Sequence, residues 1–310
     1  HMSEKTQAVS IRLWLLCIVL ISYKLRKADD TYMKCSDIEK QLELFIPKGL
    51  AQTDKKENTG LIVGRSDKNV STIIVAYRID QETIDYAVSA QADMIISYEP
   101  IIEEPILTIG STNYQGRLLL QLLRHDIACY ATGSSFDKCN GGSADWLASR
   151  LELSGVYITE PQAAYAGMED TVCQSGKGRI GYYKKKKSIE EITDMICNLF
   201  SLEGINAYIS KRDDGLTFSD VAVVVWADEK SIEAAMERGV QLIVTCGVSS
   251  KEAMKACSEH RAVLELPGET AAHIFETCVE QYLSEVLSSS VEILTIPTQR
   301  KSRFFKRRKE

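Results

Sequence analysis

Between residues 33 and 297 short apolar runs alternate with amphipathic segments, and the pattern occurs twice. Residues 73–97 (IIVAYRIDQETIDYAVSAQADMIIS) align without a gap with residues 221–245 (VAVVVWADEKSIEAAMERGVQLIVT), at a constant offset of 148. Each copy reads as an apolar strand, an N-capping aspartate (Asp80 or Asp228), an amphipathic helix and a second apolar strand. This order is typical of a βαβ unit. The chain is therefore predicted to be an α/β protein with two similar lobes.

A further helix and strand follow each copy, at residues 117–125 and 126–132 and at residues 251–260 and 261–267. The offset falls to 135 there, because the first copy holds about 13 extra residues after Glu99. Upstream, residues 36–45 predict an amphipathic helix that begins with a capping box at Ser36 and stops before Pro47. Residues 59–64 predict a short strand between two glycines.

We place the two lobes at residues 33–153 and 205–298, joined by residues 154–204, and expect them to face a central cleft. Residues 291–297 predict the last strand. Residues 176–181 (GKGRIG) have the spacing GxGxxG, but the tyrosines and lysines that follow do not begin a helix, so we reject a dinucleotide site. Ser188 and Glu191 form a capping box for a helix that runs to Phe200.

The two ends of the chain differ from the rest. Residues 13–21 are apolar and flanked by basic residues, but they are too few to span a bilayer, which needs about 20. Residues 1–32 are interpreted as a targeting segment, an extra helix, or sequence ahead of a start near Met33. Residues 299–310 form a basic tail, either a disordered end or an address or RNA-binding segment.

Composition narrows the class of protein. A net charge of −6 and a pI near 5.5 exclude a global basic field for nucleic acid. Nine cysteines without a CxxC pair indicate reduced thiols and do not suggest zinc. We therefore expect a cytoplasmic protein whose core does not enter a membrane, with a mitochondrial or nuclear location as the alternatives. His125 and His260 fall at matching helix ends and are interpreted as structural.

Candidate chemistry centres on the apolar run 94–97, which ends in Tyr98 and Glu99. Open α/β sheets carry their functional sites at the carboxyl ends of their strands, so we expect a site where this strand ends. Six segments, in order, resemble motifs of the Ngg-one-interacting-factor-three-like proteins, the GTP cyclohydrolase I type 2 homologues. They are NTGLIVG (58–64), ADMIIS (92–97), DIACY (126–130), DWL (145–147), GRIG (178–181) and Thr245-x-Gly247.

This resemblance covers about residues 33–297 and implies a toroidal ring, typically a homohexamer, with two divalent metal ions between the lobes of each subunit. The family motifs His-His-Pro, His-Thr-x-x-Asp and His-x-x-x-Glu supply the metal ligands. The matching ligand positions here are Tyr98, Glu99, Gly133, Asp137, Pro267 and Ala271. Asp137 alone keeps the family's ligand, and proline and alanine side chains donate nothing to a metal.

Glu99, Asp137 and Glu269 offer only oxygens, which suit one weakly held magnesium, manganese or calcium ion better than zinc. His273 is a further candidate close to the third motif. We therefore expect no cofactor, or one weak divalent metal, in a non-catalytic or weakly active oligomeric protein that binds a ligand or a protein partner. The alternatives are a metal-dependent hydrolase of a nucleotide-like or phosphoester substrate with a remodelled carboxylate site, and a transcription-linked or nucleic-acid-binding scaffold.

Overall fold

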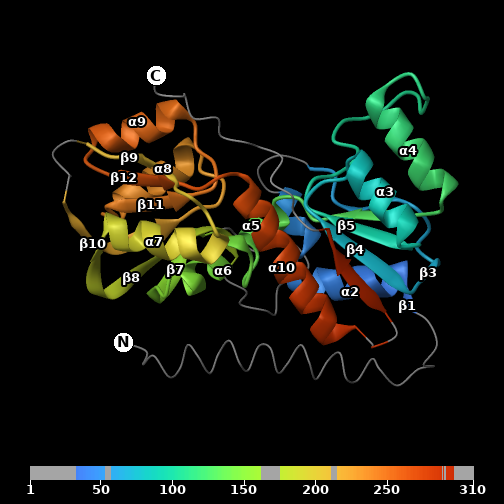
Figure 1. Cartoon of the computed structure of the whole chain (residues 1–310), viewed down its shortest axis with the longest axis horizontal. Helices are drawn as coiled ribbons and strands as arrows, with labels where there is room; N and C mark the ends of the chain where they lie inside the picture. The colour runs from blue at the N-terminus through green and yellow to red at the C-terminus, as the bar shows by residue number, and fades with distance from the viewer. Residues whose placement is uncertain are drawn as a thin grey trace, which may run out of the picture.

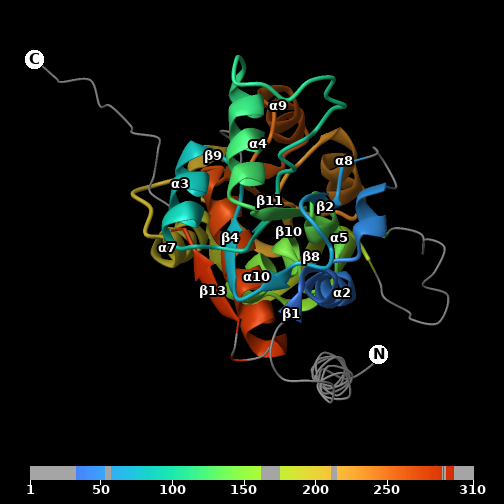
Figure 2. The ribbon, with the colours of Figure 1, turned by 90° about the vertical axis from the view of Figure 1, so that its right-hand side faces the viewer.

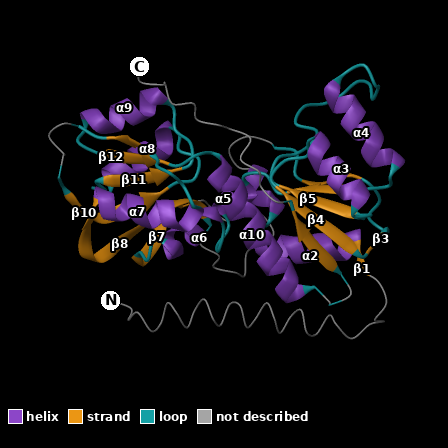
Figure 3. Cartoon of the chain, viewed as in Figure 1, coloured by secondary structure: helices purple, strands orange, loops and turns teal. Residues whose placement is uncertain are grey.

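The computed structural model describes residues 33–52, 57–161, 175–210, 215–287, 289 and 291–296. It contains two α/β lobes, each with its own main sheet (Figure 1). Figure 3 shows the two sheets set apart, with α5 (Ser135–Lys138) and α10 (Glu269–Val286) between them. The predicted N-terminal extension and the basic tail lie outside the described residues. Within the described part of the chain, no helix combines the length and the apolar character needed to cross a membrane.

The first lobe is built on a five-stranded sheet of order β13-β4-β5-β6-β2, in which β2 alone is antiparallel to its neighbour. Side chains of β4 alternate between the two faces: Ile73 and Val75 point inward, while Ile74 and Ala76 pack outward. Helices α3 and α4 cover the outer face and α2 and α10 the inner face (Figure 2). The lobe comprises β1 (Met33–Lys34), α2 (Cys35–Phe45), the 3-10 helix η1 (Lys48–Gln52), β2 (Gly60–Val63), β3 (Asn69–Val70), β4 (Thr72–Ala76), α3 (Gln81–Ser89), β5 (Met94–Ser97), α4 (Tyr114–Arg124), β6 (Ala128–Ala131) and β13 (Glu292–Thr295). Helix α6 (Ser143–Arg150) follows α5 and packs against α10 and the second sheet.

The second lobe is built on a six-stranded sheet of order β7-β8-β10-β11-β12-β9. Its parallel strands β10, β11 and β12 continue the βαβ pattern, and antiparallel strands flank them on both sides. The elements are β7 (Ser154–Pro161), β8 (Gly176–Ser188), α7 (Ile189–Phe200), β9 (Asn206–Tyr208), β10 (Thr217–Val223), α8 (Glu229–Glu237), β11 (Leu242–Thr245), α9 (Ser250–Ser258) and β12 (Ala262–Glu265).

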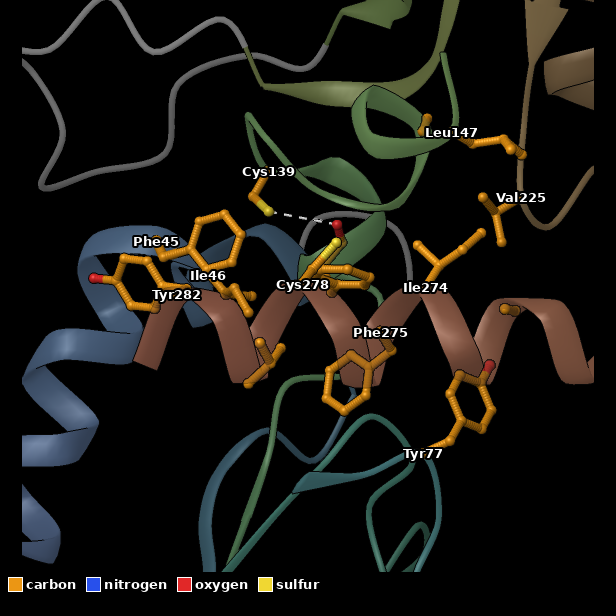
Figure 4. Close-up of a cluster of buried hydrophobic side chains, with 14 of the residues drawn as sticks. Phe45, Ile46, Tyr77, Cys139, Leu147, Val225, Ile274, Phe275, Cys278 and Tyr282 are labelled. Atoms are coloured by element: carbon orange, nitrogen blue, oxygen red, sulfur yellow. Dashed lines mark hydrogen bonds between the residues drawn. The ribbon is translucent and has the colours of Figure 1, made fainter. Parts of the chain in front are cut away.

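One apolar cluster joins the two lobes, and α10 runs through it. Phe45 and Tyr282 pack together at one end of this helix, while Phe275 points from the helix toward Tyr77 of the first lobe (Figure 4). Ile274 points to the opposite side, toward the second lobe (Figure 4). Burying both sides of an 18-residue helix removes a large apolar area from water and fixes the lobes against each other.

The repeated βαβ prediction is confirmed. Asp80 caps α3 by accepting a hydrogen bond from the Thr83 N–H, and Asp228 caps α8 in the same way through Ser231. Ser188 forms the predicted capping box with Glu191. The rejected GxGxxG segment lies in β8, so no helix follows its glycines. All seven described cysteines are free thiols, and five of them are buried.

The prediction of a capping box at Ser36 is wrong. Helix α2 begins at Cys35, and its N-cap residue Lys34 makes no side-chain cap bond. The first helical N–H groups, of Cys35 and Ser36, donate instead to the carbonyls of Lys68 and Ser66, each at 2.9 Å. A tertiary contact with a turn therefore satisfies donors that a local cap would otherwise satisfy.

Two of the predicted lobe boundaries do not match the strands that form each sheet. Residues 154–161 and 176–188 form β7 and β8 of the second sheet and are not a connection between the lobes. The last strand, β13, pairs in parallel with β4 of the first lobe although it follows the second lobe in sequence. The second lobe is therefore inserted into the first.

Candidate functional site

Two cavities lie between the lobes, and Trp226 lines both of them. The larger one, of about 620 Å³, is lined by Tyr98 and Asp137 from the first lobe and by Lys177 and Asp228 from the second. The smaller one, of about 420 Å³, lies at the carboxyl ends of β4 and β5 and beside the beginning of α10. Both volumes fall in the range of small-molecule sites.

The predicted ligand positions do not come together. Tyr98 and Asp137 line the larger cavity, whereas Glu99 and Glu269 line the smaller one. Glu269 also borders a third cavity, beside α7. Among the residues that the structure describes, no three histidine, cysteine, aspartate or glutamate side chains are placed to hold a metal ion. The proposed set of Glu99, Asp137 and Glu269 therefore does not converge on a single point.

The remaining candidate positions lie away from Glu99 and Asp137. Pro267 and His273 border the third cavity together with Glu269, and Ala271 is buried in the core. His273 packs against Trp146 and Phe200, with ring centroids 6.3 and 5.9 Å away, and burial lowers its pKa. Its imidazole therefore faces α6 and α7 and does not replace a lost ligand.

Asp137 is enclosed by hydroxyl groups. Its Oδ2 accepts a hydrogen bond from the Tyr98 hydroxyl at 2.5 Å, and its Oδ1 accepts one from the Ser143 hydroxyl at 2.6 Å. Burial raises the pKa of the Asp137 carboxyl, and the two hydrogen bonds offset part of this rise because they favour the charged form. Burial and the nearby Asp137 also raise the pKa of the Tyr98 phenol well above its usual value, so Tyr98 stays a donor.

Aromatic rings occupy the space next to Asp137. The Tyr98 ring stacks on the Tyr77 ring, with centroids 4.7 Å apart and planes inclined by 8°. Phe275 of α10 meets both rings edge-on, at 5.8 and 6.2 Å. Burial raises the pKa of Tyr77, and a hydrogen bond with the Trp226 side chain opposes the rise. The stack connects the first lobe to α10 and to the second lobe.

The position of Gly133 has no room for a side chain. Its φ is +55°, and a Cβ built there would collide with the Glu57 carboxylate. That carboxylate accepts a hydrogen bond from the backbone N–H of Ser134 at 2.8 Å. An imidazole at this position would therefore require the backbone and Glu57 to move.

These residues do not fit a pair of divalent metals. A two-metal centre needs ligands that hold two ions a few Å apart, and imidazole and carboxylate are the usual donors. Tyr98, Gly133, Pro267 and Ala271 supply no such donor, and both oxygens of Asp137 already accept hydroxyl hydrogen bonds. No catalytic step through a metal follows from this arrangement.

Glu99 lies at the rim of the smaller cavity and forms an ion pair with Arg78, 3.1 Å between Oε1 and Nη2. Burial raises the pKa of Glu99, while Arg78 opposes the rise. Deeper in the same cavity, the Oε1 atom of Glu276 accepts a hydrogen bond from the backbone N–H of Tyr77 at 3.1 Å. Glu276 is only 8 % exposed, which makes it the most enclosed carboxylate of the cavity lining among the described residues.

Sequence reasoning missed Tyr77, Trp226, Ser143 and Glu276. Tyr77 and Trp226 do carry a signal, because each follows the first strand of a βαβ copy, where α/β proteins place site residues. Ser143 and Glu276 lie in helices, and nothing local to either residue indicates its partner.

The chain is similar in sequence and in fold to several known proteins. A protein of Streptococcus pneumoniae named GTP cyclohydrolase 1 type 2 homolog is 24% identical over 254 residues, which cover 82% of this chain and 91% of that protein. NIF3-like protein 1 of Drosophila melanogaster is 26% identical over 164 residues, 53% of each chain. The crystal structure of a Bacillus cereus protein related to NIF3 superposes with a TM-score of 0.78 at 18% identity, covering 89% of this chain and 100% of the other.

The structural similarity agrees with the two-lobed α/β fold described above. The family model described as Duf34/NIF3 (NGG1p interacting factor 3) matches residues 33–302. The chain belongs to the Duf34/NIF3 family.

Proposed function

We propose that this protein acts by binding a ligand or a partner and carries no two-metal catalytic centre. One observation supports this most strongly: Tyr98 and Ser143 each donate a hydrogen bond to Asp137, the family ligand position that this chain retains. A metal ion at Asp137 would compete with these two hydroxyl groups for the carboxylate oxygens and would find no nitrogen donor at the neighbouring positions. The stacked Tyr77 ring supports Tyr98 in this arrangement.

The test is the metal content per subunit, measured by elemental analysis on untagged protein purified without chelator. We expect substoichiometric metal in the wild type and the same low content in Asp137→Asn, a nearly isosteric variant that removes the carboxylate charge. Added Mg²⁺, Mn²⁺ or Zn²⁺ should leave the melting temperature unchanged, because an ion that binds only the folded state would raise it. Near-stoichiometric metal that Asp137→Asn removes would refute the proposal.

A second set of variants separates loss of ligands from loss of fold. Tyr98→His restores an imidazole beside Asp137, and Tyr98→Phe is its matched control without a donor nitrogen. On our proposal neither variant gains a tightly bound metal, because Gly133, Pro267 and Ala271 still contribute no ligand. Circular dichroism of each variant verifies the fold. If Tyr98→His alone binds a stoichiometric metal, the substitution at Tyr98 accounts for the loss of metal binding, and the expectation drawn from Gly133, Pro267 and Ala271 is wrong.

The ring assembly belongs to the same proposal. Native mass spectrometry of the full chain should give a homo-oligomer, with a hexamer expected from the family resemblance. The hydrolase alternative predicts metal-dependent turnover of nucleotide or phosphoester substrates that Asp137→Asn abolishes. The separation of Glu99 and Glu269 from Asp137 argues against it.

A further inference from the structure

The smaller cavity occupies a distinctive position in the first sheet. Strands β4, β5 and β13 run parallel and all end at it, β13 through Ile296. Helix α3, which follows β4, packs on the outer face of the sheet, whereas α10, which precedes β13, packs on the inner face. The sheet therefore has a topological switch point between β4 and β13. Open α/β sheets bind ligands outside the carboxyl ends of their strands at such points.

The walls of the cavity are partly apolar and carry aromatic surface. Ala76 and Ile296 contribute from the first sheet, and Ala272 contributes from α10. Trp226 closes the cavity from the second lobe and is only partly buried. An indole face is the strongest aromatic partner for a cation. The cavity volume of about 420 Å³ suits a molecule of roughly ten to twenty non-hydrogen atoms.

The charge of the lining is strongly negative. Among the described residues that line the cavity, the cation is Arg78 and the carboxylates are Asp80, Glu82, Glu99, Glu269 and Glu276. The N-termini of α3 and α10 each contribute a positive partial charge of about half a unit. Together with Arg78 they offset about two of the five formal negative charges of these lining residues, so the lining itself has a negative balance.

Glu276 gives this charge a fixed position. Its hydrogen bond from the Tyr77 backbone N–H anchors the carboxylate between α10 and the end of β4. Because the residue is 8 % exposed, a cation near it is screened by water much less than at the surface. The attraction comes from the summed charge of the lining and does not require any carboxylate to lack a protein partner.

We propose that the cavity between β4, β13 and α10 binds a small organic cation, a protonated amine or quaternary ammonium with an apolar body, with its charge near Glu276 and its body against Trp226. The proposal names the ligand class of the binding function proposed above and rests on it in that respect. It involves neither Tyr98 nor Asp137, so metal content and cation binding are measured independently.

The test is calorimetric titration of the full wild-type chain with phenethylamine, choline and putrescine. The matched probes are 2-phenylethanol, which has the same body without the charge, and phenylacetate, which reverses the charge. We expect at least one of the three cations to bind at millimolar concentrations or below, with phenethylamine at least tenfold tighter than 2-phenylethanol and phenylacetate not binding. Failure of all three cations, or equal binding of phenethylamine and 2-phenylethanol, would overturn the proposal.

Variants locate the site. Glu276→Gln keeps an acceptor for the Tyr77 N–H and should weaken cation binding about tenfold or more. Trp226→Leu should weaken it about fivefold by removing the indole face. Glu237→Gln is the control, because Glu237 is an exposed carboxylate on α8 far from the lining, and it should bind as the wild type does.

If Glu276→Gln does not fold, Glu99→Gln at the rim takes its place and should also weaken binding. Unchanged affinity in a folded Glu276→Gln or Glu99→Gln would place the cation elsewhere and refute the assignment. Competition by Mg²⁺ or Ca²⁺ at equal concentration would indicate an inorganic cation site and also refute it. Low metal content together with absent cation binding would support the proposal that the protein has no two-metal centre and would reject only the proposed class of ligand.

Discussion

The Tyr98 hydroxyl is the group whose removal most directly tests how Asp137 is held. Tyr98→Phe deletes a single oxygen and keeps the ring that stacks on Tyr77 at 4.7 Å. The buried Asp137 carboxylate then loses the donor at 2.5 Å and keeps the Ser143 hydroxyl at 2.6 Å. The change therefore isolates the hydrogen bond from the packing around it.

The size of the effect follows from the charge of the acceptor. A hydrogen bond to an ionised group contributes about 1.5–3 kcal/mol, whereas one between neutral groups contributes about 0.5–1.5 kcal/mol. We expect Tyr98→Phe to lower the free energy of unfolding by about 2 kcal/mol at neutral pH. In an Asp137→Asn background the acceptor is neutral, so the same change should cost about 1 kcal/mol less.

The pH dependence has a definite sign. Because burial raises the pKa of Asp137 in the folded state, the native protein binds more protons than the unfolded chain from about pH 4 up to that raised value. Stability from this group is therefore greatest below the ordinary carboxyl pKa and falls as the pH rises through the window. Tyr98→Phe removes a bond that favours the ionised form, so the cost of the substitution should grow with pH and then level off.

The assay is urea unfolding of the wild type, Tyr98→Phe, Asp137→Asn and the double variant over a series of pH values, with unfolding followed by circular dichroism. A coupling energy near zero, or a cost of Tyr98→Phe that is independent of pH, would refute the reasoning. In that case the hydroxyl acts through a group other than the Asp137 carboxylate.

Two further predictions concern the fold. Arg179 is 3 % exposed, donates to Asp145 through two nitrogens at 2.6 Å and also donates to backbone carbonyls, so Arg179→Lys should lower the free energy of unfolding in urea by about 3 kcal/mol or more. The control Arg65→Ala removes an exposed ion pair and should leave stability unchanged. A similar loss of stability in both variants would contradict the burial argument. Gly247→Ala places a Cβ 2.6 Å from the Trp226 ring, so it should alter tryptophan fluorescence and cost about 1–3 kcal/mol. Gly204→Ala meets no atom within 4 Å and should be neutral. An unchanged spectrum and unchanged stability in Gly247→Ala would show that the Cβ is accommodated without displacing Trp226 and would contradict the prediction.

Much of the fold is predictable from local patterns. Each βαβ copy carries its own apolar strands and its own capping aspartate, Asp80 or Asp228, so adjacent residues alone specify the unit. The existence of the last strand was predictable for the same reason. Its pairing with β4 was not, because residues near 73 and 293 meet only after the second lobe has been formed between them. The predicted start of α2 was wrong for a similar reason, since carbonyl groups of the turn at Ser66 and Lys68 accept hydrogen bonds from the first N–H groups of the helix.

The site was predictable only in part. The resemblance gives Tyr98 and Asp137 as ligand positions of one site, and the structure places their side-chain oxygens in hydrogen-bonding contact. The grouping of Glu99 with Asp137 does not hold. The chain bends at Tyr98 and Glu99, where both backbone N–H groups donate to the Tyr77 carbonyl, and the Glu99 side chain lines the other cavity. Glu276 could not be found from sequence, because its role depends on the tilt of α10 against β4.

The return of β13 to the first sheet has a consequence during synthesis. All six strands of the second sheet lie between residues 154 and 265, so this lobe has a complete set of strands once that stretch leaves the ribosome. The first sheet has to wait for residues 292–295, and until then the fully buried strand β4 is an open edge. Such an edge can pair with another chain. A nascent chain that stalls before residue 292 therefore exposes an aggregation-prone strand, and the part made first is the part that closes last.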